Sequence, residues 1–332
     1  MTTLDVHMPV AAQTGIDPIV SYGRRAEADG YDRLWLPETW GRDTVSVLTV
    51  LAERTDSIGL GSSILPVYSR SPALLGQTAA TLQEVSGGRF RLGVGPSGPA
   101  VIEGWHGVEF ERPLRRTREY VEIVKQVLSG ERVEYQGELF QLSGFRLRGE
   151  APTPAPPIDV AAMGPKAVEL AGRFADGWHA ILFTPEGIRE RLEDLHRGAE
   201  LGDRDRNEAR VTLSLNCCAL EDRERARRLA RQHLAFYVGG MGTYYRDSLA
   251  GQGYEEEVAE IAAAWGSGER ERALEAIDDA MLDDLCAAGT PEEAREALER
   301  FERVDELDAV AVGFPRGAER AEIEATIDAL AP

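Results

Sequence analysis

Short apolar segments alternate with longer amphipathic stretches along almost the whole chain. Eight of the apolar segments have the length and composition of buried strands. The stretches between them carry apolar positions at helical spacing, and several begin at Asp, Ser or Pro, which is typical of helix starts. The predicted strands span residues 4–10, 33–37, 57–65, 89–94, 158–162, 178–183, 211–219 and 309–314.

This repeated strand–helix unit predicts parallel strands joined by right-handed crossovers. An open doubly wound sheet would need a point where the strand order reverses, and the regular units show no break near the midpoint. Eight units therefore favour a closed α/β fold, the (β/α)8 TIM barrel. We expect residues 1–332 to form one barrel domain.

Two segments fall outside the repeat. Residues 132–142 alternate around Gln136-Gly137, which predicts a β-hairpin. Residues 220–305 carry helical patterns interrupted by glycine clusters, and they separate the seventh and eighth strands. We expect this tract to be a helical insertion that serves as a lid or as an oligomer contact.

Charge narrows the possible partners. The chain has 57 acidic and 37 basic residues and a net charge of −20, which argues against nucleic acid or an anionic membrane as a partner. Lys125 and Lys166 are the two lysines, and every other basic residue is arginine. An acidic, lysine-poor chain suits a halophilic source, although high genomic GC content would also favour arginine.

Other compositional signals are plain. No apolar run approaches the ~20 residues that span a membrane, and the N-terminus lacks a signal-peptide pattern, so we expect a cytoplasmic protein. Cys217, Cys218 and Cys286 show no metal-ligand spacing and are interpreted as small buried residues.

The strand over residues 57–65 ends in small residues. Ser62 and Ser63 precede Ile64, and small residues at a strand end allow a flat ligand to approach the backbone. In a parallel barrel the C-terminal strand ends form the ligand-binding edge. Our hypothesis is that this strand end forms the back wall of a flavin-type cofactor pocket.

A glycine-rich motif follows the fourth strand. Residues 93–98 match G-x-G-x-x-G, but a dinucleotide fingerprint belongs in a first strand–helix unit, and Pro96 removes an amide donor. We interpret Gly95, Pro96 and Ser97 as a tight loop at the barrel mouth.

A second candidate binding segment precedes a helix. Gly164-Pro165-Lys166 places free amides, a partial positive charge and a rare lysine at a helix start, which favours a phosphate site. The alternative is an ordinary helix start with a lysine facing solvent.

His7 and Glu38 stand at or near C-terminal strand ends and are our candidates for proton transfer. The alternative for His7 is a buried imidazole with a structural role. The alternative for Glu38 is a helix cap or an ion pair with Arg42.

The sequence also resembles the luciferase-like superfamily, and within it the coenzyme F420-dependent oxidoreductases, the group that includes methylenetetrahydromethanopterin reductase. The resemblance covers nearly the whole chain. It is carried by LWLPETWGRD, LGSSILPVYSRSPALLGQTAATLQEVSGGRFRLGVGPSGP, GWHGVEFERPLRRTREYVEIV and AAMGPKAVELAGRFADGW.

The resemblance implies a (β/α)8 barrel, an insertion before the last strand and a homodimer or larger assembly. It implies a deazaflavin at the strand ends, backed by a bulge with a cis peptide at Ser63-Ile64. It also implies phosphate contacts, which fall on Met163, Gly164, Lys166 and Ala167.

We therefore expect an F420-dependent oxidoreductase that passes a hydride between the deazaflavin C5 atom and a small organic substrate. Glu38 would orient the ring edge or the substrate, and His7 would transfer a proton. Relatives that act on sugar phosphates or secondary alcohols have Asp-His where Glu38-Thr39 stands, so the substrate is not predicted. The alternatives are an FMN-dependent monooxygenase and a non-catalytic flavin-binding homologue.

Overall fold

The computed structural model describes residues 2–9 and 15–332 of the chain. Its described residues fall into two compact units. Unit 1 comprises residues up to Asp32, Ala180–Glu193 and Val211–Pro332, and unit 2 comprises Arg33–His179 and Asp194–Arg210. Each unit is described by itself.

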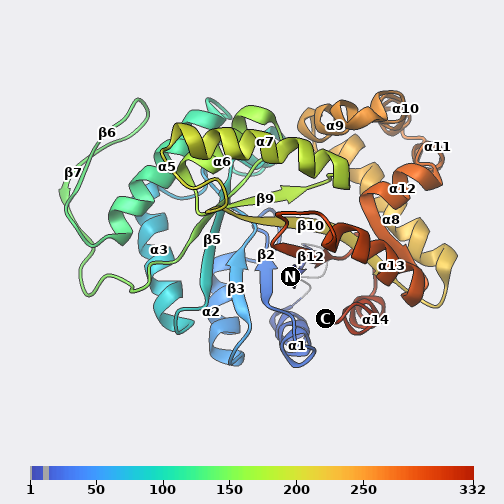
Figure 1. Cartoon of the computed structure of the whole chain (residues 1–332), viewed down its shortest axis with the longest axis horizontal. Helices are drawn as coiled ribbons and strands as arrows, with labels where there is room; N and C mark the ends of the chain where they lie inside the picture. Colours follow the sequence, from blue (N-terminus) through green and yellow to red (C-terminus); the bar gives the residue numbers. More distant parts are fainter. Residues whose placement is uncertain (1, 10–14) are drawn as a thin grey trace. The chain divides into compact units, whose positions relative to one another are not determined.

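Unit 2 contains the middle of the strand–helix series (Figure 1). Its strands β2, β3, β5, β8 and β9 pair in that order, all parallel, and β6 and β7 form the predicted antiparallel hairpin. The elements are β2 Arg33–Leu36, α2 Thr44–Arg54, β3 Gly59–Ser62, β4 Leu65–Pro66, α3 Pro72–Val85, β5 Phe90–Gly95, α4 Pro99–Ile102, α5 Pro113–Leu128, β6 Val133–Gln136, β7 Gln141–Phe145, β8 Ile158–Ala161, α6 Pro165–Phe174 and the start of β9 Gly177–Ile181; α7 Pro185–Leu201 begins in unit 1 and ends here.

Unit 1 contains the first and last parts of the chain. Strand β12 pairs in parallel with both β1 and β10, and the C-terminal half of β10 pairs with β11. The elements are β1 Thr3–His7, α1 Ile16–Ala28, β10 Arg210–Ala219, α8 Arg223–Gly240, α9 Thr243–Leu249, the π-helical turn η2 Ala250–Tyr254, α10 Glu255–Gly266, α11 Arg270–Glu275, α12 Asp279–Leu285, β11 Cys286–Gly289, α13 Pro291–Glu302, β12 Ala309–Gly313 and α14 Arg320–Ala329.

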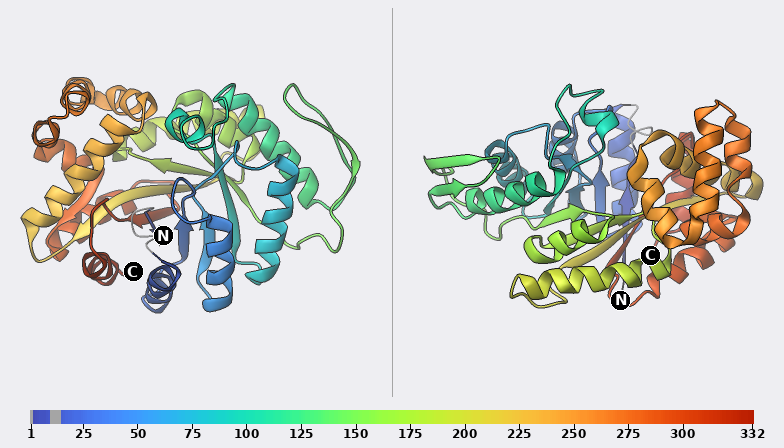
Figure 2. Two further views of the ribbon diagram at one scale, coloured as in Figure 1. Left: turned by 180° about the vertical axis from the view of Figure 1, so that it is seen from behind. Right: turned by 90° about the horizontal axis from the view of Figure 1, so that it is seen from above.

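The strand order confirms the predicted fold class, a closed (β/α)8 barrel. Its eight barrel strands are β1, β2, β3, β5, β8, β9, β10 and β12. Helices α2 and α3 pack against β3 and β5, as the two further views also show (Figure 2). Six of the eight barrel strands lie within two residues of their predicted segments. The third strand is shorter than predicted. The first was predicted over residues 4–10 and ends at His7, and residue 10 lies outside the described residues.

Two sequence predictions need correction. The strand expected over 57–65 is broken into β3 and β4, because residues 63 and 64 leave the ladder. The tract expected to be helical contains a strand, β11, whose residues Cys286–Gly289 are too small to stand out as a strand pattern. This strand forms because the ten-residue β10 extends beyond β12 and offers a free edge.

The helical tract still has its own apolar core. Helices α8, α10 and α12 pack with β11 around buried aliphatic residues such as Leu234, Ile261 and Met281. The three cysteines are free and buried, as predicted, and burial raises the pKa of each thiol. Their thiols are therefore unreactive at neutral pH.

Candidate functional site

The bulge between β3 and β4 is the centre of the candidate site in unit 2. The Ser63-Ile64 peptide is cis, as the resemblance predicted. The amide of Ser63 donates to the carbonyl of Leu36 at 2.8 Å, and the Ile64 carbonyl accepts from the amide of Glu38 at 3.2 Å. Strand β2 and the residues after it therefore hold both sides of the bulge.

Ser62 fixes the base of this bulge rather than facing a ligand with its side chain. Its hydroxyl donates to the Gly93 carbonyl at 2.9 Å and accepts from the Gly93 amide at 3.0 Å, and the residue is fully buried. Its predicted contact with a cofactor is thus left to its backbone. The space beside Gly61 is also filled, because a Cβ there would lie 2.3 Å from the Trp35 ring.

His179 is a site residue that the sequence reasoning missed. It lies on β9, it is buried, and its Nε2 is 3.2 Å from the Ser63 hydroxyl. The ring stands edge-on to Trp35 with 4.8 Å between centroids. His179 lies in the middle of β9, so the strand-end rule that selected His7 did not select it.

Glu38 forms an ion pair with Arg70. Arg70 binds both of its carboxylate oxygens, one of them at 2.9 Å, and the Ser69 hydroxyl donates to it at 3.2 Å. Arg70 also contacts Asp43 at 2.9 Å. Burial opposes the charge on Arg70, but the bonds to Glu38 outweigh it and raise the Arg70 pKa. The ion-pair alternative for Glu38 thus holds with Arg70 in place of Arg42.

The glycine-rich segment supports the bulge from the next strand. A Cβ on Gly95 would lie 3.3 Å from Ala161 and 3.4 Å from Ile64, so the absence of a side chain lets these residues pack closely. Pro96 and Ser97 follow, and Ser97 has a φ of 59°. The helix after them, α4, has only four residues, which excludes a dinucleotide fingerprint.

Residues 163–167 form the start of α6. Gly164 is the N-cap, and it is exposed, as are Pro165 and Lys166. The amides of Gly164 and Lys166 donate to no residue that the structure describes. Lys166 is 74% exposed and lies 3.0 Å from Glu169, whose pKa this pairing lowers. Met163 and Ala167 flank this start and are half-buried.

These unit 2 residues fit a flat ring with an anionic tail. The strands are parallel, so the ends of β3, β5 and β8 share one edge. The bulge at that edge is held by neighbouring backbones. The α6 start at the same edge offers unpaired amides and a lysine, which suit a phosphate.

His7, the other proposed proton-transfer residue, belongs to unit 1. It ends β1, pairs in register with Gly313 and is partly exposed. His233 on α8 is close enough for the charge of His7 to affect it. Burial is the main cause that lowers the His233 pKa to about 3, and positive charge on His7 and Arg316 adds to the effect.

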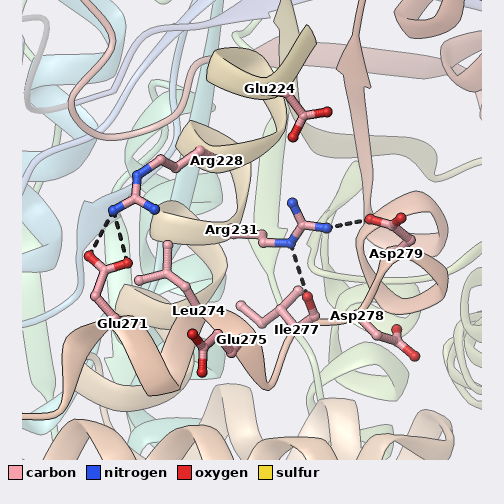
Figure 3. A pocket seen from close by; sticks show the side chains of 9 residues that line it. All are labelled: Glu224, Arg228, Arg231, Glu271, Leu274, Glu275, Ile277, Asp278 and Asp279. Carbon is pink, nitrogen blue, oxygen red and sulfur yellow. Dashed lines mark hydrogen bonds and ion pairs between the residues drawn. The ribbon is translucent and has the colours of Figure 1, made fainter.

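A separate pocket of about 520 Å³ opens on unit 1 between α8, α11 and α12 (Figure 3). The two arginines that line this pocket already form ion pairs, Arg228 with Glu271 at 2.7 Å and Arg231 with Asp279. No reactive group lines it. In the described ranges, no cluster of side chains has the composition of a metal site, and no helix is long and apolar enough to cross a membrane.

The fold is a (β/α)8 barrel, and the candidate ligand-binding edge lies at its C-terminal strand ends. Residues 1–304 match the family model of the luciferase-like monooxygenases, and the chain belongs to this family. The resemblance read from the sequence is therefore confirmed.

Three relatives are informative. A protein of Mycobacterium tuberculosis named as a coenzyme F420-dependent oxidoreductase is 34% identical over 83% of this chain and 85% of its own length. A 5,10-methylenetetrahydromethanopterin reductase of Archaeoglobus fulgidus is 30% identical over 90% of each chain. The solved F420-dependent tetrahydromethanopterin reductase of Methanopyrus kandleri superposes with a TM-score of 0.84 at 24% identity, over 99% of this chain and 97% of its own.

Proposed function

We propose that this protein is an F420-dependent oxidoreductase that transfers a hydride between the deazaflavin and a small organic substrate. The observation that carries the proposal is the edge of unit 2, where a braced bulge and the unpaired amides of α6 occur together. The relative named as a coenzyme F420-dependent oxidoreductase aligns over 83% of the chain, which supports the same cofactor.

When bound, a reduced deazaflavin supplies a hydride from its C5 atom. The chain's part is to bind and orient. The bulge at Ser63-Ile64 would back the ring. Ser62 and His179 would hold the bulge in place. Gly95, Pro96 and Ser97 would border the ring on the β5 side.

The start of α6 would bind the anionic tail. Met163 and Gly164 would contribute backbone contacts, and Lys166 would contribute its ammonium group. Ala167 would border the tail, with its amide already donating to the Gly164 carbonyl at 3.0 Å. In the structure the Lys166 ammonium group bonds to the Glu169 carboxylate, so a phosphate that binds Lys166 would compete with Glu169.

Glu38 and His7 would have separate tasks. The two bonds from Arg70 fix the direction of the Glu38 carboxylate, which suits orientation of a ring edge or substrate. His7 would remain the group that exchanges a proton. A homo-oligomer, a cytoplasmic location and a halophilic source stay predictions from the sequence.

Titration of the purified protein with F420 and with FMN, each followed by fluorescence, tests the proposal. We expect micromolar affinity for F420 and much weaker binding of FMN. Lys166→Ala should weaken F420 binding about three- to tenfold, whereas Glu169→Gln should tighten it, because the lysine loses its internal competitor. Absence of F420 binding would contradict the proposal.

The family match favours one second candidate, an FMN-dependent monooxygenase. This alternative predicts tight FMN binding and consumption of oxygen by the protein with reduced FMN. Oxygen uptake in an electrode cell with reduced FMN, compared with reduced F420, separates the two. The non-catalytic alternative predicts F420 binding but no oxidation of reduced F420 by any acceptor.

A further inference from the structure

The stretch of unit 1 from residue 225 to residue 246 contains no aspartate or glutamate, in a chain that has 57 acidic residues. It covers most of α8 and the first residues of α9. The four arginines in its first half are all paired with acids outside the stretch, as Arg225 is with Glu322 at 2.9 Å. Its second half is aromatic. An anion therefore meets less repulsion here than on the rest of a chain of net charge −20.

Arg316, in the loop after β12, contacts this second half. Its backbone amide donates to Nδ1 of His233 at 3.0 Å, and its guanidinium lies 4.4 Å above the ring of Phe236. The side chain is exposed and makes no ion pair or hydrogen bond with any residue that the structure describes. The nearest acid along the chain, Glu319, is engaged elsewhere, because its carboxylate accepts the amide of Glu322 at the start of α14. A guanidinium stacked on an aromatic face keeps its N–H edge available for a carboxylate.

His233 offers a second donor next to Arg316. Because its Nδ1 accepts the Arg316 amide, the proton of the neutral imidazole is on Nε2, which leaves Nε2–H as a donor. Burial, together with positive charge on His7 and Arg316, lowers the His233 pKa to about 3, so the ring stays neutral and Nδ1 stays an acceptor. Among the described residues, no carboxylate acts on this ring.

Aromatic side chains form the surroundings of these two donors. Tyr237, one helical turn after His233, lies against the imidazole with 4.8 Å between centroids, and it meets Tyr245 edge-on at 4.9 Å. Both tyrosines and Phe236 are half-buried. Burial raises the pKa of Tyr237 to about 12 and also raises the pKa of Tyr245, so both hydroxyls stay uncharged and repel no anion. Half-buried rings of this kind suit contact with a flat apolar ligand.

We infer that this part of unit 1 binds the carboxylate of a small aromatic acid. The site, called the Arg316 site, consists of Arg316, His233, Phe236, Tyr237 and Tyr245, all of them in unit 1. Arg316 would donate to both carboxylate oxygens, His233 Nε2–H would donate a further hydrogen bond, and the ring of the acid would lie against the tyrosines. One planar guanidinium matches the single charge and flat shape of a carboxylate better than a phosphate dianion. No F420 takes part, so this inference is independent of the proposed function.

Calorimetric titration of the full chain without F420 tests the inference, with benzoate and benzamide as probes. Benzamide has the shape of benzoate but no charge, and we expect benzoate to bind about tenfold more tightly. Arg316→Gln should weaken benzoate binding about tenfold and leave benzamide binding unchanged. His233→Phe removes the second donor and should weaken benzoate binding about three- to tenfold.

Arg148→Gln is the matched control for Arg316→Gln. Arg148 follows β7, is exposed and likewise makes no ion pair in the described part of the chain, so its replacement changes the net charge equally. It should leave benzoate binding unchanged. A loss of affinity as large as that of Arg316→Gln would show that overall charge, and not the Arg316 site, attracts the anion, and would contradict the inference.

A second readout locates the bound acid. The ¹⁵N chemical shift of His233 Nε2 should move on addition of benzoate to the unaltered protein but not to Arg316→Gln, and an equal concentration of inorganic phosphate should not displace benzoate. The inference is wrong if Arg316→Gln binds benzoate as the unaltered protein does, if benzamide binds as tightly as benzoate, or if phosphate displaces it.

Discussion

Gly93 shows at the scale of one residue how the bulge is held. A Cβ at this position would lie 1.9 Å from the carbonyl oxygen of Ser62, which is backbone and has no room to move. Gly93→Ala should therefore destabilise the protein by about 3 kcal/mol or more, as over-packing of a core does. Urea unfolding measures the change.

Gly164→Ala is the matched control for Gly93→Ala. Its Cβ would meet nothing within 4 Å, and its φ of −78° suits alanine. It should change the free energy of unfolding by less than about 0.5 kcal/mol. Equal effects of the two substitutions would contradict the packing argument.

The lowered pKa of His233 predicts, also at the residue scale, that the free energy of unfolding depends on pH. Its pKa falls from 6.5 to about 3 on folding, so between these values the unfolded chain binds a proton that the folded chain does not. Stability from this group is thus complete above about pH 6.5 and decreases as the pH falls. Between about pH 7 and about pH 5 the loss amounts to about 2 kcal/mol.

The measurement compares urea unfolding of the unaltered protein and of His233→Phe at both pH values. The variant should lose about 2 kcal/mol less on acidification. His196→Phe should retain the full loss. A slope that is the same in all three proteins would show that His233 is not the group responsible.

At the scale of elements, the side chain of Gln252 joins the helical tract to the loop that follows β9. Gln252, in the π-helical turn η2, accepts from the Thr184 amide at 2.9 Å and donates to the Leu182 carbonyl at 3.1 Å. Leu182 has a φ of 57°, an uncommon conformation for a residue with a side chain. Gly187 leaves the space, since a Cβ there would lie 2.2 Å from the Gln252 oxygen.

Gln252→Ala should destabilise the protein by about 2–4 kcal/mol, because it leaves the buried Thr184 amide and Leu182 carbonyl without partners. Hydrogen exchange should speed up over residues 182–187 and 243–254. Gln77→Ala, on the exposed face of α3, is the control and should be nearly neutral. Unchanged exchange in both segments would disprove the joining role of Gln252.

At the scale of the whole molecule, the net charge of −20 opposes folding through self-repulsion. Raising NaCl from about 0.05 M to about 1 M shortens the Debye length to about 3 Å and should raise the melting temperature. Calorimetry at pH 7.5 measures the shift. Sucrose at matched osmolality separates screening from solute exclusion, and a melting temperature that falls with salt would contradict the argument.

The sequence determined the barrel, the strand order along the chain and the position of the bulge. The barrel and the strand order depend on local patterns, namely apolar runs and cap residues. The position of the bulge came from the resemblance to a known family, because the local pattern predicted an unbroken strand over residues 57–65. The helix starts at Asp43 and Ser71 were predictable for the same reason, and both caps accept a hydrogen bond as expected.

Only the tertiary structure decided which side chains meet. Arg70 rather than Arg42 pairs with Glu38, the Ser62 hydroxyl binds Gly93, and His179 meets Ser63 from 116 residues away. Strand β11 likewise exists because β10 offers it an edge. Such partners depend on the register and facing of strands that are distant in the chain, and no local pattern encodes that geometry.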